Sequence, residues 1–271
     1  MPRDLRVWLG GGFILVLIVC AVFAYWLSPF DPLEQDLLTA TAPPMQEPGH
    51  WLGTDSLGRD VLSRLIYASR VALTVAFVAS LLAGLIGTAL GLAAGYFGGW
   101  WDAIVSRLID IWMAFPPILL SILLVAVLGS GLHSVIAAIA VIDWTRFARV
   151  VRAEAQQQAR LEYAEAATAL GMGRGAILVS EILPNVLPVA LVLLSLEMGI
   201  AVIVEAILSY VGLSVSTDTP TWGGMIAEGR QIVYQAWWVL VFPLVTLFAT
   251  VLAFNQLGDG LRQWLDPMLK R

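Results

Sequence analysis

The chain has 271 residues, of which 59% are hydrophobic and only 13% charged, and its formal net charge is −5. Soluble domains carry roughly 25% charged residues, so this composition excludes an ordinary soluble protein and indicates a chain that lies mainly in lipid. The single cysteine, Cys20, excludes an intramolecular disulfide. The two histidines, His50 and His133, lie far apart in sequence, and with one cysteine they predict no dedicated metal site.

The first predicted element is an uncleaved transmembrane helix over residues 7–27. Arg3 and Arg6 precede this apolar run, which is long for a signal-peptide core and is followed by no Ala-x-Ala cleavage site. Residues 29–70 are proline-rich and mixed in character, which predicts a loop. We therefore divide the chain into residues 1–70, the first helix and its outward loop, and residues 71–271, the main transmembrane domain.

Five further spans follow, because roughly 20 apolar residues cross a bilayer. The long uncharged run at 111–142 is interrupted by a polar stretch at 129–134, so we divide it between two spans. The predicted spans are 71–101, 107–129, 133–151, 185–213 and 236–258. The sequence thus predicts an all-α, multi-pass membrane protein with six transmembrane helices.

The basic residues predict the orientation of these spans. Six spans place both termini on one side of the membrane, and the side richer in Lys and Arg is cytoplasmic. Eleven basic residues lie on the side of the termini: Arg3, Arg6, Arg107, Arg146, Arg149, Arg152, Arg160, Arg174, Arg262, Lys270 and Arg271. Four lie opposite: Arg59, Arg64, Arg70 and Arg230. This bias predicts cytoplasmic termini and a cytoplasmic loop at 152–184, with the 29–70 and 214–235 loops facing outward.

A glycine ridge marks the second span. Gly87, Gly91, Gly95 and Gly99 recur at four-residue spacing, which lets another helix approach closely. The ridge favours packing within this chain, and contact with a second subunit is the alternative.

The predicted cytoplasmic loop contains a short amphipathic helix. Four residues at positions i, i+3, i+4 and i+7 share one face: Tyr163, Ala166, Ala167 and Leu170. The alanines keep that face small for a close partner, and Glu165 offers a carboxylate to a partner arginine. Gly171 and Gly173 end the helix, since glycine readily adopts the left-handed cap conformation. An ordinary amphipathic connector is the alternative interpretation.

The outward loop holds a compact group of glycines and charges. Asp55, Arg59 and Asp60 can pair locally, and Gly53 and Gly58 allow tight turns. A structural clamp within the loop is the favoured interpretation, and contact with an external binding protein is the alternative.

Two carboxylates occur at membrane depth in the fifth span. Glu197 and Glu205 are eight residues apart, about 12 Å along a helix, and so share a face. Ionisable groups in the membrane are costly and usually face an interior or a water-filled path. They are candidates for the translocation path, where a peptide amino terminus or a metal ion would suit them. A structural hydrogen bond between helices is the alternative.

The chain lacks the residue that ATP hydrolysis by a P-loop requires. Lys270 is the only lysine, and it is not preceded by the glycine pattern of that loop. The chain is therefore predicted not to be an enzyme, and any energy from ATP must come through a partner.

Several segments resemble one family of membrane proteins. Glu165 to Gly171, with Ile182-Leu183-Pro184 beyond it, resembles the cytoplasmic "EAA" loop of permease subunits in ATP-binding-cassette (ABC) importers. Further segments resemble the second, C-type permease of dipeptide, oligopeptide and nickel importers: 50–65, 95–99, 115–116, 220–223 and 253–267. Three features depart from the family pattern: Tyr163 in place of phenylalanine, the polar Asp143-Trp144-Thr145, and Glu197 in place of a small or neutral residue.

The resemblance implies the fold of a type I ABC importer permease in the bacterial inner membrane. It implies as partners a second homologous permease, two ATPase subunits that bind ATP and Mg, an external substrate-binding protein and membrane lipid, but no nucleic acid. No cofactor is expected on this chain. Residues 161–175 would form the coupling segment, with Glu165 and Gly171 as its main residues.

The substrate expected from the resemblance is a short peptide, with nickel or a metal chelate as the alternative. A proton-coupled secondary transporter with Glu197 and Glu205 as relay groups is an alternative of another class, as is a passive channel or scaffold. Secondary transporters often contain inverted repeats, and the two halves of this chain show no convincing repeat.

Overall fold

The computed structural model describes residues 5–215 and 218–265, which form helices joined by turns and irregular segments. Within these ranges the only β-type pairing is an isolated bridge between Thr54 and Asp60. The first six helices are α1 (Leu5–Val22), α2 (Ala24–Leu27), α3 (Val61–Phe97), α4 (Gly99–Met113), α5 (Pro117–Leu128) and α6 (Leu132–Gln158). The others are α7 (Glu162–Ala169), α8 (Arg174–Ile177), α9 (Leu183–Tyr210), α10 (Trp222–Gln231) and α11 (Trp237–Leu265). A 3₁₀ turn, η1 (Leu37–Thr39), and a π-helical turn, η2 (Leu178–Ile182), complete the elements.

Within these described ranges, three helices are long and apolar enough to cross a membrane: α3, the helix Arg174–Tyr210 that α8, η2 and α9 form together, and α11. The pair α4 and α5 adds a fourth if it counts as one broken span. The apolar part of α1, Val7–Val22, is shorter, and α6 contains several charged residues. The prediction of an all-α, multi-pass membrane protein is confirmed.

The second predicted span is displaced. Helix α3 begins at Val61, so residues 61–70 are helical, although the sequence predicted a loop there. The carboxylate of Asp60 caps this helix by accepting a hydrogen bond from the backbone N–H of Ser63 at 2.7 Å. The helix ends at Phe97 because Gly98 adopts a positive φ of 64°.

The predicted third span, 107–129, is wrong as a single straight helix. Helices α4 and α5 meet at a bend of 88° instead. Pro116 and Pro117 lie at this break, where proline supplies no N–H and disfavours a helical residue before it. The predicted 214–235 loop also contains α10, which begins where the side chain of Thr221 accepts a hydrogen bond from the N–H of Gly224.

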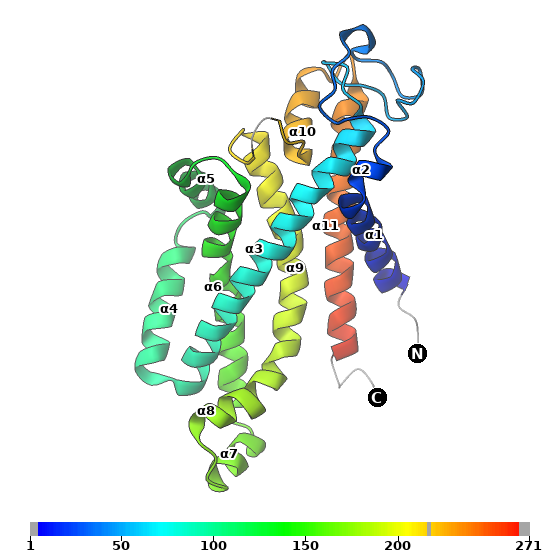
Figure 1. Cartoon of the computed structure of the whole chain (residues 1–271). Helices are drawn as coiled ribbons and strands as arrows, with labels where there is room; N and C mark the ends of the chain where they lie inside the picture. The colour runs from blue at the N-terminus through cyan, green and yellow to red at the C-terminus, as the bar shows by residue number, and fades with distance from the viewer. Residues whose placement is uncertain (1–4, 216–217, 266–271) are drawn as a thin grey trace.

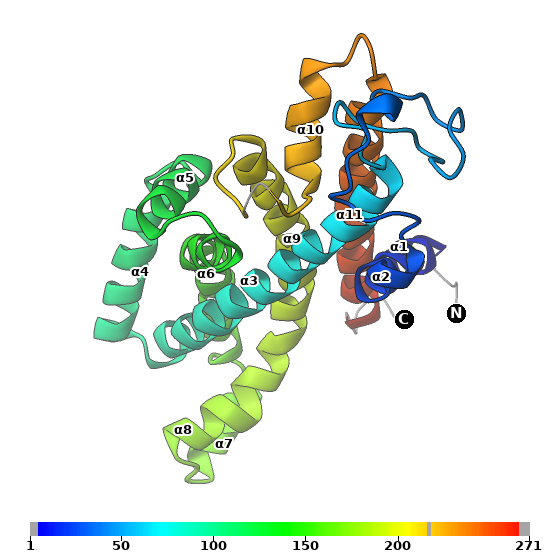
Figure 2. The same cartoon turned by 45° about the horizontal axis from the view of Figure 1, so that its top comes forward.

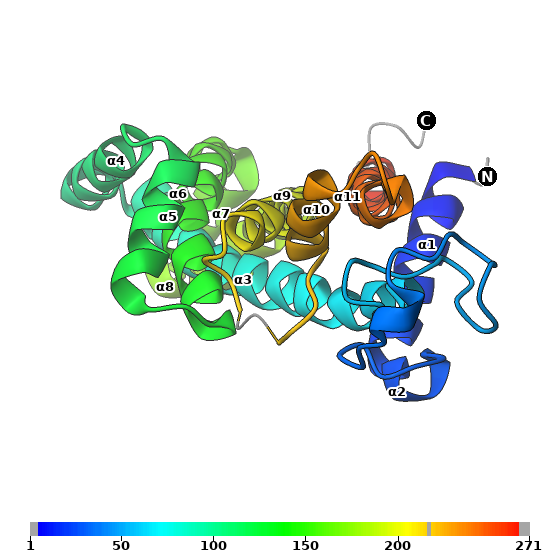
Figure 3. The same ribbon diagram turned by 90° about the horizontal axis from the view of Figure 1, so that it is seen from above.

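Helix α3 joins the two sides of the molecule. It crosses the other helices obliquely and contacts α6 and α9 as well as α1 (Figure 1). Seen from above, α4, α5 and α6 lie on one side, α1 and α2 on the other, and α9, α10 and α11 between them (Figure 3). The irregular segment 28–60 and α10 lie at one end of the molecule, and α7 and α8 project at the opposite end (Figures 1 and 2).

The glycine ridge packs against α6 within the chain. A Cβ atom on Gly87, Gly91 or Gly95 would lie 2.3, 2.7 or 2.5 Å from a carbonyl oxygen of α6, which is closer than van der Waals contact allows. These three glycines therefore confirm the favoured interpretation. Gly99 does not belong to the ridge, because it begins α4 and no atom lies within 4 Å of its Cβ position.

Candidate coupling and translocation sites

Helix α7 ends in a cap that requires glycine. Gly171 has a φ of +81°, in the left-handed region, and the N–H of Met172 donates to the carbonyl of Ala167 at 3.1 Å. Gly173 has an ordinary φ of −67° and instead precedes α8. The prediction that glycine ends this helix is thus confirmed for Gly171, and the helix end is fixed by backbone geometry.

The four residues predicted to share one face of α7 do not have the same environment: one is buried, one is half-buried and two are exposed. Ala164 and Ala167 are buried in a cluster that contains residues of α8 and η2, the elements that α7 contacts most, and residues of α3, α6 and α9. Tyr163 is half-buried, and its hydroxyl lies 2.7 Å from Oε1 of Gln158. Two of the four predicted face residues therefore anchor α7 to its own chain.

The opposite face of α7 is open. Glu165 and Ala166 are exposed, and Leu170 is 84% exposed. The carboxylate of Glu165 makes no hydrogen bond or ion pair within the described part of the chain. This surface, Glu165, Ala166, Leu170 and Gly171, is called the α7 face below.

The α7–α8 segment is continuous with a membrane helix. The chain is helical throughout Arg174–Tyr210, and the π turn η2 is the irregular part of this helix. Pro184 cannot donate a helical hydrogen bond, and η2 lies directly before it. Any displacement of α8 is therefore transmitted into α9.

At the other end of the molecule, buried charges hold the outward loop. Asp55 is fully buried and accepts hydrogen bonds from Nε of Arg59 at 2.7 Å and from a terminal nitrogen of Arg64 at 2.5 Å. Both arginines also donate to Glu228 of α10, at 2.8 Å from Arg59 and 2.6 Å from Arg64. We call these four residues the outward ion cluster. It joins the loop to α3 and α10.

Glu228 is the member of this cluster that sequence reasoning missed. It lies far from Asp55 in the chain, and no local motif indicates that α10 folds back onto the loop. Burial raises the pKa of Glu228, but the two guanidinium groups outweigh that effect, and the pKa lies below its ordinary value of 4.5. Glu228 is therefore held as a carboxylate.

The remaining loop-signature residues are also internal. A Cβ on Gly58, which has a φ of +74°, would lie 1.8 Å from the carbonyl oxygen of Asp36, and one on Gly53 would lie 2.6 Å from that of Ala42. Asp60 is buried, caps α3 and accepts from Nδ1 of His50 at 2.9 Å. These contacts agree with the interpretation of a structural clamp.

The two membrane carboxylates have different partners. Glu197 is buried, and its two oxygens lie 3.3 and 3.0 Å from one terminal nitrogen of Arg146 on α6. Glu205 is also buried and accepts from the hydroxyls of Ser209 at 2.5 Å and Ser214 at 3.1 Å. Neither carboxylate is among the residues that line the two main cavities. Internal partners therefore account for both groups in this conformation.

Comparison with known proteins identifies two family models along the chain. A model described as "Binding-protein-dependent transport system inner membrane component" matches residues 87–271. A second, described as "N-terminal TM domain of oligopeptide transport permease C", matches residues 6–44.

Similar sequences and a similar fold are known. The chain is 44% identical over 263 residues to the glutathione transport system permease protein GsiD of Salmonella paratyphi A, covering 96% of this chain and 86% of that protein. It is 42% identical over 261 residues to the protein of that name from Escherichia coli O6:K15:H31, covering 95% and 85%.

A chain in the crystal structure of an amino acid ABC transporter with histidines superposes with a TM-score of 0.59. It has 18% sequence identity and covers 75% of this chain and 95% of its own length, so the likeness concerns the fold alone. The two family models and the relatives together show that this chain belongs to the binding-protein-dependent inner-membrane components, as an ABC importer permease of the peptide and nickel importer family.

Proposed function

We propose that this chain forms half of the translocation path of an ATP-driven importer of short peptides and receives mechanical work at the α7 face. The observation that supports this most strongly is an exposed apolar and acidic surface on a segment that is anchored beneath by Ala164 and Ala167. A carboxylate and a leucine exposed together on such a segment suit a docking partner. The partner is a separate ATPase chain.

The orientation belongs to the same proposal. The α7 face is cytoplasmic, as are both termini, and segment 28–60 faces outward. That outward segment exposes Leu38 at 97%, Met45 at 80% and Trp51 at 63%. Large apolar side chains that are exposed on one segment suit an interaction surface. A substrate-binding protein would dock on these side chains, while the buried loop signature holds them in place.

A peptide substrate is favoured over a metal chelate. The relatives with 44% and 42% identity are named for glutathione, which is itself a small peptide. The acidic Glu197, which had suggested a metal, is paired with Arg146. Membership of the ABC importer permeases favours an ATP-driven importer over the secondary-transporter alternative.

The test replaces Gly171 in the assembled importer. The chain is purified with its second permease, two ATPase subunits and binding protein, and ATP-driven peptide uptake is measured in proteoliposomes. Gly171→Asp is expected to insert, because the structure leaves open space around its Cβ position, and to lower uptake about tenfold by adding a charge to the docking surface. The backbone strain that any side chain meets at a φ of +81° is shared by the control below.

Gly171→Asn is the matched control. Asparagine tolerates the positive φ about as well as aspartate does but adds no charge, so its uptake should stay within about twofold of the wild type. Normal uptake by Gly171→Asp at normal expression would remove the α7 face as the coupling site. Uptake by the wild type that continues without ATP would remove the proposed function itself.

A further inference from the structure

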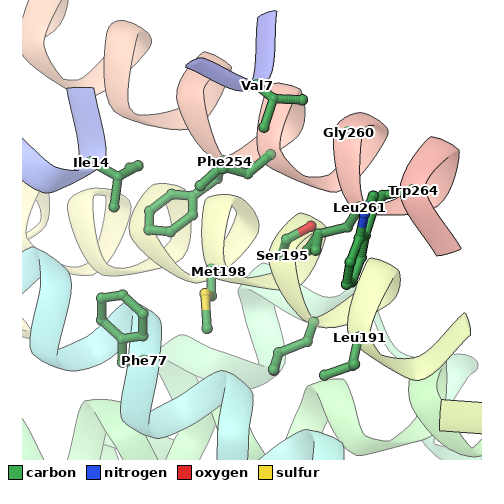
Figure 4. Close-up of a pocket in the computed structure, with 12 residues that line it drawn as sticks. Val7, Ile14, Phe77, Leu191, Ser195, Met198, Phe254, Gly260, Leu261 and Trp264 are labelled. Carbon is green, nitrogen blue, oxygen red and sulfur yellow. The ribbon is translucent and has the colours of Figure 1, made fainter. Parts of the chain in front are cut away.

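The two main cavities of the chain differ in chemistry. The larger, about 370 Å³, lies between α1, α9 and α11, with Phe77 of α3 at its edge (Figure 4). Its lining is apolar apart from Ser195 and the indole of Trp264, and it includes no charged residue. Such a cavity offers no group that could orient a charged peptide.

The second cavity, about 210 Å³, lies between α5, α6 and α9. Isoleucine and valine side chains form most of its wall, and its polar lining residues are Ser121, Asp143 and Arg146. Binding pockets for whole small molecules measure about 300–1,000 Å³. This cavity is therefore large enough for one end of a peptide.

The charges at this cavity are unequally satisfied. Arg146 is compensated by Glu197, whose oxygens lie 3.0 and 3.3 Å from its terminal nitrogen. Asp143 is 96% buried, its nearest cation is Arg146 at 3.9 Å, and it accepts no hydrogen bond from the residues that the structure describes. A buried carboxylate without a donor is costly, and an incoming donor would relieve that cost.

The excess charge decides what kind of group fits. The cluster of Asp143, Arg146 and Glu197 contains two carboxylates and one guanidinium, so it attracts a cation more than an anion. A metal ion would need several ligands, and no group of three or more His, Cys, Asp or Glu side chains occurs within the described ranges. An ammonium group needs only hydrogen-bond acceptors, and every unblocked peptide carries one at its amino terminus.

We infer that Asp143, at the α5–α6–α9 cavity, binds the amino terminus of the transported peptide, while Glu197 holds Arg146 in place beside it. The inference rests on the proposed function, because it presumes that peptides pass through this chain. It also shifts the substrate-contacting role from Glu197 and Glu205 to a residue that sequence reasoning noted only as unusually polar.

The experiment compares alanyl-alanine with N-acetyl-alanyl-alanine, which lacks the ammonium group. ATP-driven uptake of each is measured in proteoliposomes that contain the full importer, with both peptides saturating the same, unaltered binding protein. Asp143→Asn is expected to lower the ratio of free to acetylated uptake about tenfold, since a charge-assisted hydrogen bond is lost. An unchanged ratio overturns the inference.

Asp110→Asn is the matched control. Asp110 is an exposed carboxylate on α4 that does not line the cavity, so the same chemical change there should leave the ratio unaltered. A fall of the same size in Asp110→Asn overturns the inference as well. If wild-type importer takes up neither peptide with ATP, the proposed function fails instead, and the two failures are thereby distinguished.

A second variant decides the matter if Asp143→Asn does not assemble. Ile118 lines the same cavity and is 43% exposed, so a longer side chain can be accommodated there. Ile118→Lys places an ammonium group at the cavity and should lower the ratio through competition for Asp143, whereas Ile118→Met should not. Equal ratios in these two variants overturn the inference.

Discussion

The two ends of the molecule use their polar residues in opposite ways. At the outward end, Asp55, Arg59, Arg64 and Glu228 are committed to one another. At the α7 end, Glu165 has no hydrogen-bond or ion-pair partner among the residues that the structure describes, and Leu170 is 84% exposed. The outward loop is thus a closed structure whose signature residues stabilise it, whereas the α7 face is an open one. Changes should therefore cost stability at the first end and transport at the second.

The largest effect is expected from Asp55→Ala. Removing this buried carboxylate leaves Arg59 and Arg64 with Glu228 alone, and breaking a buried ion pair costs about 3–5 kcal/mol. Thermal unfolding in detergent should shift downward, and amide hydrogen exchange should accelerate in residues 28–60.

Glu34→Ala is the control in the same loop, because Glu34 is exposed and its stability effect should stay within about 0.5 kcal/mol. If the two variants unfolded at the same temperature, the outward ion cluster would not stabilise the outward loop.

The converse effect is expected from Leu170→Ala. Because Leu170 is mostly exposed, its truncation should change stability by less than about 0.5 kcal/mol. Uptake should fall roughly fivefold or more, since an exposed apolar anchor at an interface contributes about 1 kcal/mol or more. Leu170→Met, which keeps the apolar area, should restore most of the uptake. If Leu170→Ala lost stability but kept its uptake, the α7 face would serve stability and not transport.

The smallest effect is expected from acid. The pKa of Glu228 in the folded protein lies below its ordinary value of 4.5, so its contribution to stability is present above pH 4.5 and is lost as the pH falls through the lowered value. Wild-type unfolding temperature should fall below about pH 4.5, and the fall should be shallower in Glu228→Gln. Identical pH profiles for the two proteins would show that Glu228 is not held by the arginines.

Sequence reasoning predicted the parts of the fold that depend on local chemistry. Apolar runs located the membrane helices, and the glycine ridge and the cap at Gly171 follow from the absence of a side chain. It failed at the bend between α4 and α5, because the uncharged run continues across Pro116 and Pro117 without a change of composition.

The candidate sites were predictable only in part for a related reason. The residues of the α7 segment are contiguous, so their helix and its cap could be predicted, but the cluster that buries Ala167 also includes residues of the more distant helices α3, α6 and α9. The pairing of Glu228 with Arg64 joins residues 164 positions apart. The pairing of Glu197 with Arg146 similarly crosses two membrane helices. Such contacts depend on tertiary packing, which periodicity does not reveal.

The unbroken helix from Arg174 to Tyr210 has a mechanical consequence. Its 37 residues span about 55 Å, so it behaves as a lever arm that passes from α8 at one end of the molecule to the end of α9 near α10. A tilt of about 5° at one end would displace the other by about 5 Å, comparable to one helical turn. Small rotations imposed at α8 would therefore suffice to open or close the wall that α9 contributes to the α5–α6–α9 cavity.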